Sequence, residues 1–456
     1  MNEDPPAPHH SHARGRALQE DRPAWEADRQ EGVLPATHGV RTMRFLFRPP
    51  AADATGLLSL PWDRPLGEWD PALLLEVPQR GISRHVVRFV MSGGHVFALK
   101  EINEHLARHE YALLSEWEEE GLPTVSVLGI CVDRPDGQEA ILVTRYLEYS
   151  MSYRWLFSSP RGEHSAERLL DTMVELLVRL HLAGVFWGDC SLSNTLFRPD
   201  AGALAAYLVD AETAERHPTL SAGQRLYDVD LARERVGAEL LDLQAGDLLP
   251  ADIDPIEVAD SLIPRYQALW DEVTHEQVFG VDEQQWRIAE RLQRLNDLGF
   301  DVGEVELITS PEGAKLRVET RVAEPGQHRR ELFRLTGLEV QERQARRLLN
   351  DMRAFRANLE SKTPGSVSES FAAHRWLAEV YQPVVDAIPR NLAGRLAPAE
   401  VFHEVLEHRW FLSEKAQRDV GAAEATRSYF DTVLPQTPRE VTTPSVIAEL
   451  GPRADR

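Results

Sequence analysis

Cysteine is nearly absent from this sequence, since only Cys131 and Cys190 occur among its 456 residues. Two cysteines cannot form a disulfide framework or a cysteine-rich zinc site. Long apolar runs are also lacking: no segment approaches the ~20 apolar residues of a membrane-spanning helix. No charged and then apolar pattern of a signal peptide opens the chain. We therefore expect a cytoplasmic protein without a transmembrane segment.

Basic charge is scarce as well, because 50 Lys and Arg residues stand against 73 Asp and Glu residues, for a formal net charge of −23. Nucleic acids and anionic membranes bind basic surfaces, so we expect no nucleic-acid partner. Most of the basic residues are arginines, and lysine occurs only at Lys100, Lys315, Lys362 and Lys415. A lysine at the end of an apolar segment is therefore conspicuous in this chain.

The chain is too long for a single hydrophobic core, and its patterning predicts several units. Residues 1–42 lack a hydrophobic period and are expected to be disordered. Met43, where the first apolar pattern begins, is a candidate for the native start. The expected divisions are a disordered tail, a β-rich unit, a helical unit, a small α+β module, C-terminal helices and a flexible tail, at residues 1–42, 43–148, 149–280, 281–365, 366–435 and 436–456.

The β-rich unit is expected to be an antiparallel sheet with one inserted helix. Its strands are predicted from short apolar runs between turn residues, at residues 73–77, 85–90, 96–100, 125–132 and 140–144. Gly93 and Gly94 supply the positive φ angles that a tight hairpin needs. Lys100 shares a face of its strand with Ala98, so we expect its ammonium group at the rim of an apolar pocket.

A glutamate interrupts the apolar stripe of the helix that follows. The stripe has helical spacing and consists of Ile102, Leu106, Leu113, Leu114 and Trp117. Glu110 lies within it, and an unpaired buried carboxylate is costly. Two interpretations remain open: Glu110 pairs with Lys100, or it lies at the edge of the stripe and reaches water.

The helical unit carries three polar residues that suggest a chemistry. Asp189 and Asn194 stand five positions apart on a loop, and Asp210 directly follows the apolar run 206–209. Phosphoryl transfer needs a carboxylate to orient the attacking hydroxyl, and oxygen ligands to hold a metal on the phosphates. Each motif alone is common by chance. Combined with Lys100 and Glu110 in this order, they predict a kinase-like fold.

This constellation resembles the protein-kinase-like superfamily, and its small-molecule branch more than the protein kinases. Gly188-Asp189 with Asn194, and Asp210-Ala211-Glu212, are similar to the Gly-Asp…Asn and Asp-x-Glu patterns of aminoglycoside phosphotransferases and lipopolysaccharide (Kdo/WaaP) kinases. More closely, the chain resembles an uncharacterised bacterial family with a C-terminal domain of unknown function. The kinase resemblance covers about residues 72–275, and the family resemblance extends to about 432.

The resemblance implies an α+β class and a bilobal protein-kinase-like fold. The N-lobe would be an antiparallel sheet, the C-lobe would be helical, and an additional C-terminal α+β and helical module would follow. It also implies ATP and Mg²⁺ as cofactors. The implied roles are phosphate binding, fixation of the lysine, catalytic base and two Mg²⁺ ligands, at Lys100, Glu110, Asp189, Asn194 and Asp210, respectively.

The resemblance further implies nucleotide contacts in the β-rich unit. The connector 144–148 would offer backbone groups to adenine, and a loop at 79–84 would cover the phosphates. That loop has one glycine where protein kinases have three, so its backbone grip on phosphate is weaker. The implied contact residues, besides Lys100, are Gly81, Ala98, Thr144 and Tyr146.

Two functions from different classes follow. The first is an ATP- and Mg²⁺-dependent phosphotransferase that acts on a hydroxyl of a small molecule, sugar or glycolipid. The alternative is a nucleotide-binding pseudokinase or scaffold, in which residues 282–432 recruit a protein partner. A third possibility is that the same site transfers AMP rather than phosphate.

Two features of the C-terminal part resemble binding sites for other ligands, but neither is expected to be one. A helix predicted at 339–360 has an outer face of arginines, at Arg343, Arg346, Arg347, Arg353 and Arg356. A solvated amphipathic face is favoured there over a docking site for a phosphate-bearing partner. The run 402–408 nearly imitates a zinc-binding helix, but its two histidines are five positions apart and roughly 140° out of phase. Zinc is therefore not expected.

Overall fold

The computed structural model describes residues 43–77 except 48 and 50, residues 84–158, 166–274, 326–362 and 366–437, residue 300, and four short strands between 277 and 322. The tail predicted at 1–42 and most of the phosphate-covering loop, including Gly81, lie outside the described residues. Most of the tail predicted at 436–456 does so too.

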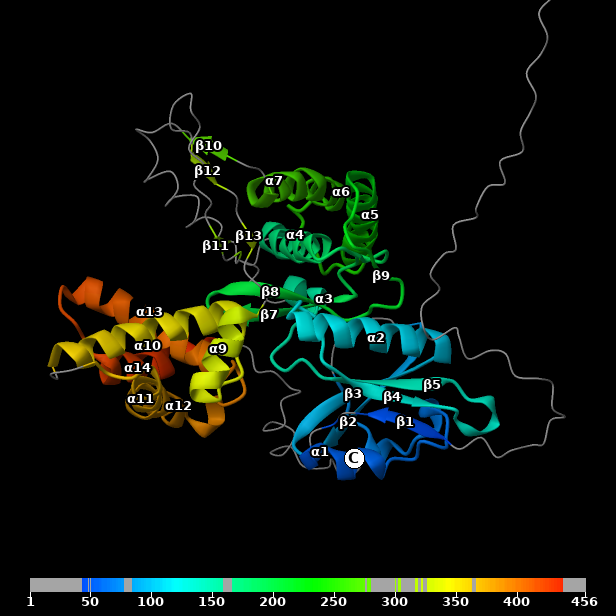
Figure 1. Cartoon of the computed structure of the whole chain (residues 1–456), viewed down its shortest axis with the longest axis horizontal. Helices are drawn as coiled ribbons and strands as arrows, with labels where there is room; N and C mark the ends of the chain where they lie inside the picture. Colours follow the sequence, from blue (N-terminus) through cyan, green and yellow to red (C-terminus); the bar gives the residue numbers. More distant parts are fainter. Residues whose placement is uncertain are drawn as a thin grey trace, which may run out of the picture. The chain divides into compact units, whose positions relative to one another are not determined.

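The N-lobe contains a five-stranded antiparallel sheet in the order β1-β4-β5-β3-β2 (Figure 1). Its strands are β1 Arg44–Phe47, β2 Val86–Ser92, β3 His95–Ile102, β4 Val127–Val132 and β5 Ala140–Arg145. The strand predicted at 73–77 is wrong, because only Leu75 pairs with another strand there. Asp70 caps a short 3-10 turn at Pro71–Leu73 by accepting the N–H of Ala72. An Asp-Pro start favours such a turn over a strand.

Each face of the sheet has its own apolar cluster. Helix α2 Glu104–Glu120 packs on β4 and β5, with Leu142 among the buried residues beneath it. The opposite face carries Ile141 and Val143 and is covered by the segment that includes helix α1 Ala51–Leu58. The period of two residues along β5 thus places neighbouring side chains in different clusters.

The C-lobe is built around helix α4, which is buried along most of its length. Helix α7 and strand β8 pack against it (Figure 1). The helices of this lobe are α3 Tyr153–Ser158, α4 Ala166–Leu182, α5 Ala222–Ala245, α6 Pro255–Asp260 and α7 Leu262–Thr274. Its strands are β6 Val185–Phe186, β7 Thr195–Asp200, β8 Ala203–Leu208 and β9 Glu215–Arg216. The hairpin β7–β8 follows the loop of Asp189 and Asn194, and ends just before Asp210.

A separate cluster of buried residues, including Trp376, Phe402 and Tyr429, holds the C-terminal helices together. The helical segments here are α9 Gln327–Thr336, α10 Glu342–Lys362, α11 Glu369–Trp376, the π-helical Leu377–Tyr381, α12 Gln382–Asp386, α13 Pro398–Ala416 and α14 Ala422–Thr432. The short strands before them are β10 Gln277–Phe279, β11 Val302–Glu304, β12 Leu316–Val318 and β13 Arg321–Val322, which pair as β10–β12 and β11–β13. Among the helices that the structure describes, none has the length and apolar composition needed to cross a membrane.

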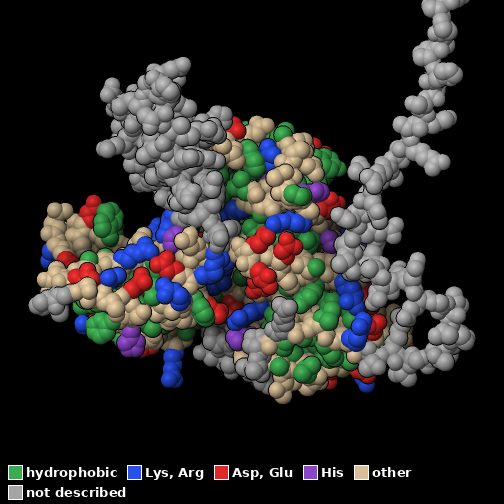
Figure 2. Space-filling model, viewed as in Figure 1, with side chains coloured by type: hydrophobic (Ala, Val, Ile, Leu, Met, Phe, Trp, Pro, Cys, Tyr) green, Lys and Arg blue, Asp and Glu red, His purple; other side chains and the backbone are tan. Residues whose placement is uncertain are grey.

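Basic and acidic side chains alternate over the visible face of the C-terminal helices (Figure 2). Several arginines of the α10 face form ion pairs, such as Arg353 with Glu331. Arg343 departs from the predicted solvated face: its side chain is only 16% exposed and pairs with Glu175 of α4 at 2.6 Å. The periodic pattern correctly predicted a polar face. It did not predict that one end of this face contacts the C-lobe.

A reciprocal set of hydrogen bonds joins the C-terminal helices to the β7–β8 turn. Asp200 accepts the backbone N–H groups of Arg343 at 3.1 Å and Gln344 at 2.8 Å. In return, Glu400 of α13 accepts those of Ala201 at 2.8 Å and Gly202 at 2.9 Å. Both carboxylates are almost fully buried. Because buried carboxylates are stable only with such donors, these bonds fix the C-terminal helices on the C-lobe.

The Asp200 contact predicts a pH-dependent stability. Burial raises the pKa of this carboxyl from 3.8 to about 6, although the N–H groups of Gln344 and Arg343 oppose the shift. Between these values the folded protein holds a proton that the unfolded chain releases. The contribution of Asp200 to the free energy of unfolding therefore falls as the pH rises from 3.8 through about 6.

We expect Asp200→Asn to flatten this part of the pH profile. Urea unfolding of the wild type, Asp200→Asn and the control Asp252→Asn, which changes an exposed aspartate, would measure it. The difference in slope corresponds to at most roughly 3 kcal/mol over the whole window. Identical slopes for the wild type and Asp200→Asn would contradict the assignment.

Candidate active site

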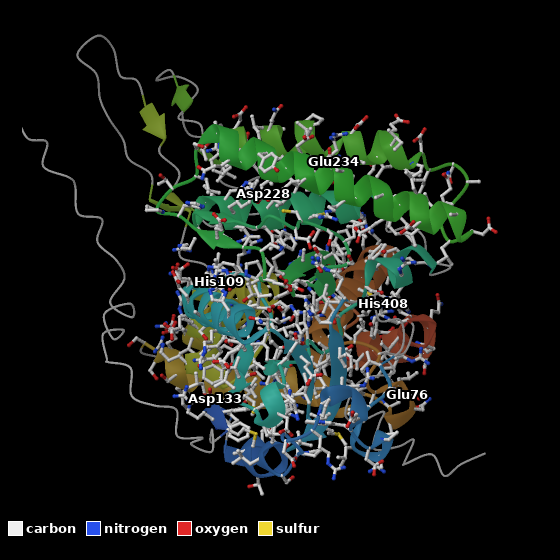
Figure 3. The ribbon with its side chains drawn as sticks, turned by 90° about the vertical axis from the view of Figure 1, so that its right-hand side faces the viewer. Glu76, His109, Asp133, Asp228, Glu234 and His408 are labelled. Atoms are coloured by element: carbon white, nitrogen blue, oxygen red, sulfur yellow. The ribbon has the colours of Figure 1, made fainter. Side chains whose placement is uncertain are left out.

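The loop that carries Asp189 is held in place by hydrogen bonds to Asp228 of α5. This carboxylate is fully buried and accepts the backbone N–H groups of Trp187 and Gly188, both at 2.8 Å. It also contacts the thiol of Cys190 at 3.2 Å and Nε2 of His181 at 3.0 Å. Figure 3 shows Asp228 and Glu234 on the same helix. One aspartate thus holds the loop by accepting several hydrogen bonds.

The importance of Asp228 was not predicted from the sequence, although the sequence contains a pattern that indicates it. It lies on α5 at helical spacing with Ala232 and Val236, all of which are buried. A carboxylate within an apolar stripe is the same anomaly that drew attention to Glu110. The far end of the loop is held similarly, because Glu239 accepts the backbone N–H groups of Leu192 at 2.7 Å and Ser193 at 3.0 Å.

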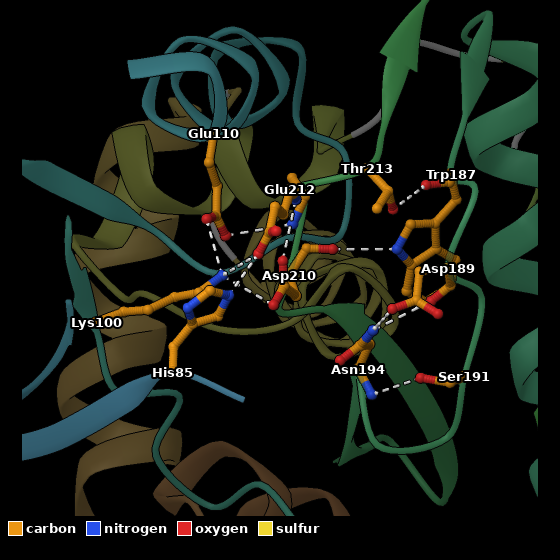
Figure 4. A network of polar contacts seen from close by, with 11 residues as sticks. His85, Lys100, Glu110, Trp187, Asp189, Ser191, Asn194, Asp210, Glu212 and Thr213 are labelled. Carbon is orange, nitrogen blue, oxygen red and sulfur yellow. Dashed lines mark hydrogen bonds and ion pairs between the residues drawn. The ribbon is translucent and has the colours of Figure 1, made fainter. Parts of the chain in front are cut away.

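Asp189 and Asn194 lie in direct contact on this loop (Figure 4). The Asn194 amide donates to Oδ2 of Asp189 at 3.0 Å. The other carboxylate oxygen, Oδ1, lies 3.3 Å from Nε of Arg235, a residue of α5 that the sequence did not single out. Val209 donates its N–H to the carbonyl of Asn194 at 3.0 Å, which brings the neighbouring Asp210 to the same region.

Lys100 joins the two lobes at the centre of the site (Figure 4). Its Nζ lies 3.0 Å from Oε2 of Glu110 and 2.8 Å from Oδ2 of Asp210. Glu212 is also near, at 3.8 Å, and is hydrogen-bonded to His85 at 2.8 Å. Glu110 is 1% exposed, so it pairs with Lys100, and the alternative in which it reaches water is wrong.

The charges of this cluster are mutually dependent. Burial lowers the pKa of Lys100, but the carboxylates of Glu110 and Asp210 outweigh it, so the pKa is raised overall. Burial, followed by the charge of Asp210, raises the pKa of Glu110 to about 7, while Lys100 opposes this shift. The lysine is therefore protonated at neutral pH and is the cation that balances the carboxylates around it.

These residues line one cavity of about 660 Å³. The expected site residues found in its wall are Ala98, Lys100, Glu110, Thr144, Tyr146, Asp189, Asn194 and Asp210. A cavity of this size is typical of small-molecule and cofactor sites. The N–H groups of Arg145 and Tyr146 are already donated to the carbonyls of Ser126 at 2.8 Å and Val96 at 2.9 Å, so neither is free for adenine.

The donor chemistry at Asp210 and Asn194 fits Mg²⁺. Within the described residues there is no group of three or more His, Cys, Asp or Glu side chains arranged to hold a metal. Mg²⁺ is usually bound by one or two carboxylates together with substrate phosphates and waters, and not by a cage of protein ligands. One carboxylate and one amide oxygen near the ammonium group of Lys100 are therefore a suitable set.

Two protein-family models match different regions of the chain. Residues 95–235 match the model of the lipopolysaccharide kinase (Kdo/WaaP) family, and residues 268–434 match DUF4032, a domain of unknown function. A search of curated proteins finds no match. Among solved structures, the chain is similar to WaaP in complex with acyl carrier protein, at 15% identity over 52% of this chain and 96% of that chain, with a TM-score of 0.32. The predicted resemblance is confirmed: the chain has a bilobal, protein-kinase-like α+β fold, with a lipopolysaccharide kinase-like region at 95–235 and a DUF4032 region at 268–434.

Proposed function

We propose that the protein is an ATP- and Mg²⁺-dependent phosphotransferase that acts on a hydroxyl of a small molecule, sugar or glycolipid. One observation carries this proposal: Lys100 is paired with Glu110 and Asp210 in the same cavity that holds Asp189 and Asn194. A half-buried lysine between two carboxylates, beside a second acidic loop, is suited to binding and transferring a charged phosphoryl group.

Each side chain has a defined task in this reaction. Lys100, held by Glu110, binds phosphate oxygens of ATP. Asp210 and Asn194 supply the oxygen ligands for Mg²⁺, which neutralises charge on the phosphates when bound. Asp189 orients the acceptor hydroxyl and takes its proton as the oxygen attacks the γ-phosphorus. The bond to the β,γ-bridging oxygen breaks, and ADP leaves.

The surroundings of Asp189 support its role as base. Its side chain is 20% exposed and lines the cavity, so an acceptor hydroxyl can reach it. Asn194 and Arg235 each contact one of its two oxygens, which fixes the orientation of the carboxylate. Preorganised groups of this kind avoid reorganisation during the reaction.

Nucleotide binding is tested by the melting temperature of the full-length protein. We expect MgATP to raise it in the wild type, and Asp210→Asn to lose most of this rise because a metal ligand is removed. EDTA should reduce the effect in the wild type. Asp252→Asn, an exposed aspartate away from the cavity, is the matched control and should respond like the wild type.

The outcomes separate the candidate functions. No MgATP-dependent shift in the wild type would overturn the phosphotransferase proposal. Binding without any turnover, whichever acceptor is supplied, would favour the pseudokinase or scaffold. Mass spectrometry of a modified acceptor distinguishes a gain of phosphate from a gain of AMP.

A further inference from the structure

The wall of the active-site cavity includes residues of the DUF4032 region. Arg395 and Leu396 line it, just ahead of helix α13, and so does Thr437 at the end of the described chain. These residues flank the C-terminal helices, more than 180 positions after Asp210. The cavity is therefore completed by a part of the chain that the kinase-like region alone does not contain.

The path of the chain explains how Arg395 reaches the cavity. Met151, beyond the connector, pairs with Phe197 of β7 through bonds of 2.7 and 3.0 Å. Pro199 of the same strand lines the cavity, and the next residue, Asp200, is bonded to α10. Glu400, five positions after Arg395, is bonded to the β7–β8 turn. The reciprocal bonds between the lobe and the C-terminal helices thus hold Arg395 beside this end of the cavity.

Two polar atoms in this wall are buried without a partner. The hydroxyl of Ser150 and Nε of Arg395 are both inaccessible to solvent, and within the described residues neither has a hydrogen-bond partner. Both residues line the cavity. Arg395 keeps one other contact, because its Nη1 donates to the carbonyl of Thr437. Buried polar groups are nearly always satisfied in native proteins, so two unsatisfied donors on residues that line one cavity indicate a missing ligand group.

We propose that Arg395 and Ser150 bind an anionic group, a phosphate or carboxylate, of the acceptor substrate. A guanidinium and a hydroxyl are both donors, and a guanidinium favours planar or tetrahedral oxyanions. The inference rests on the proposed phosphotransferase function. In this arrangement the acceptor presents a hydroxyl to Asp189 and its anionic group to Arg395.

The nucleotide does not account for this subsite. Its phosphates are matched by Lys100 and by the oxygen ligands Asp210 and Asn194. Its adenosine part is uncharged and is expected at the connector. A cation beyond the connector therefore has no counterpart on ATP.

This assignment gives the DUF4032 region a role inside the reaction. It supplies an acceptor-binding residue and completes the cavity, in place of acting only as a surface for a separate partner. The kinase-like region would keep nucleotide binding, whereas selection of the acceptor would depend on the C-terminal helices.

The test uses the full-length protein and three probes: glucose 6-phosphate, glucuronate and the neutral sugar glucose. We expect at least one anionic probe at millimolar concentration to raise the melting temperature of the wild type by about 2 °C or more, and glucose to have no effect. Arg395→Gln should abolish this rise or weaken the apparent affinity by about tenfold or more. Arg390→Gln, an exposed arginine outside the cavity wall, is the matched control and should behave like the wild type.

Ser150→Ala separates ligand binding from a structural role. The hydroxyl makes no bond within the described protein, so its removal should leave the melting temperature of the unliganded protein unchanged or slightly higher. The rise caused by the anionic probe should shrink. A lower melting temperature without ligand, together with an unchanged response to the probe, would show a structural role and overturn the proposal for Ser150.

MgATP is titrated into the same variants to separate the two proposals. Arg395→Gln should keep the full MgATP response. If neither anionic probe stabilises the wild type, or if Arg395→Gln responds to the probes like the wild type, the subsite is refuted while nucleotide binding stands. A variant that loses only the MgATP response would assign the anion to the nucleotide, which also refutes it. If MgATP fails in the wild type while the Arg395-dependent response persists, the subsite stands and the phosphotransferase proposal falls.

Discussion

Asp189→Asn is expected to lower MgATP-dependent ADP release by about 10²–10⁴-fold, the usual contribution of a general base. Asparagine has nearly the same size and can still accept the hydrogen bond from Asn194, but it cannot take a proton from the acceptor. Of its contacts in the described part of the chain, the ion pair with Arg235 is lost, and that arginine is 58% exposed, so the effect on folding should be small. A coupled ADP assay, run with each candidate acceptor, measures the rate.

Nucleotide affinity supplies the control for this variant. Because Asp189 does not contact Lys100 in the structure, we expect the MgATP-dependent rise in melting temperature to be retained. The turnover of Asp252→Asn should equal that of the wild type. Unchanged turnover in Asp189→Asn would show that another group is the base. Loss of MgATP binding would show instead that Asp189 acts in the nucleotide site.

The largest effect on stability is expected for Asp228→Ala. The substitution leaves the N–H groups of Trp187 and Gly188 without their acceptor and removes the partner of Nε2 of His181, which keeps its contact with Tyr266 through Nδ1. Breaking a buried charged network of this kind costs roughly 3–5 kcal/mol. Urea unfolding followed by circular dichroism measures the loss. ADP release should fall too, because the loop that positions Asp189 is no longer fastened.

Asp230→Ala is the matched control, two positions along the same helix. Its side chain is 48% exposed and pairs with Arg233, so its loss should cost about 1 kcal/mol or less. Asp228→Asn should fall between the two, because one acceptor oxygen remains. If Asp228→Ala is no less stable than Asp230→Ala, the fastening role is refuted.

Local sequence patterns were sufficient to predict most strands of the N-lobe and the pairing of Lys100 with Glu110 as one interpretation. The hairpin at Gly93 and Gly94 and the strand that carries Lys100 follow from turn chemistry and from the period of two residues, although β3 runs two residues further, to Ile102. Glu110 stood out because a carboxylate within a helical apolar stripe needs a cation. Such predictions depend on neighbours in the sequence, and the sequence displays those directly.

Local patterns failed to identify one of the five strands of the N-lobe sheet. Residues 73–77 are as apolar as a strand, but the preceding Asp70 and Pro71 start a turn. The strand that completes the sheet is Arg44–Phe47, which pairs with Val132 to Gly129 far along the chain. Apolar composition indicates that a segment is buried, but the partner across a sheet is chosen by the packing of the whole lobe.

The sequence by itself determined the kinase-like order of polar residues and the class of chemistry that they suggest. Only the tertiary structure showed that Asp228 holds the loop of Asp189, that Arg343 and Glu400 anchor the C-terminal helices, and that Arg395 lines the same cavity as Lys100 and Asp189. The reason is physical: periodicity shows which face of an element is buried, but not what lies against it. Contacts between residues 40 to 200 positions apart depend on how complete elements pack, and that information is not present in any short stretch of the chain.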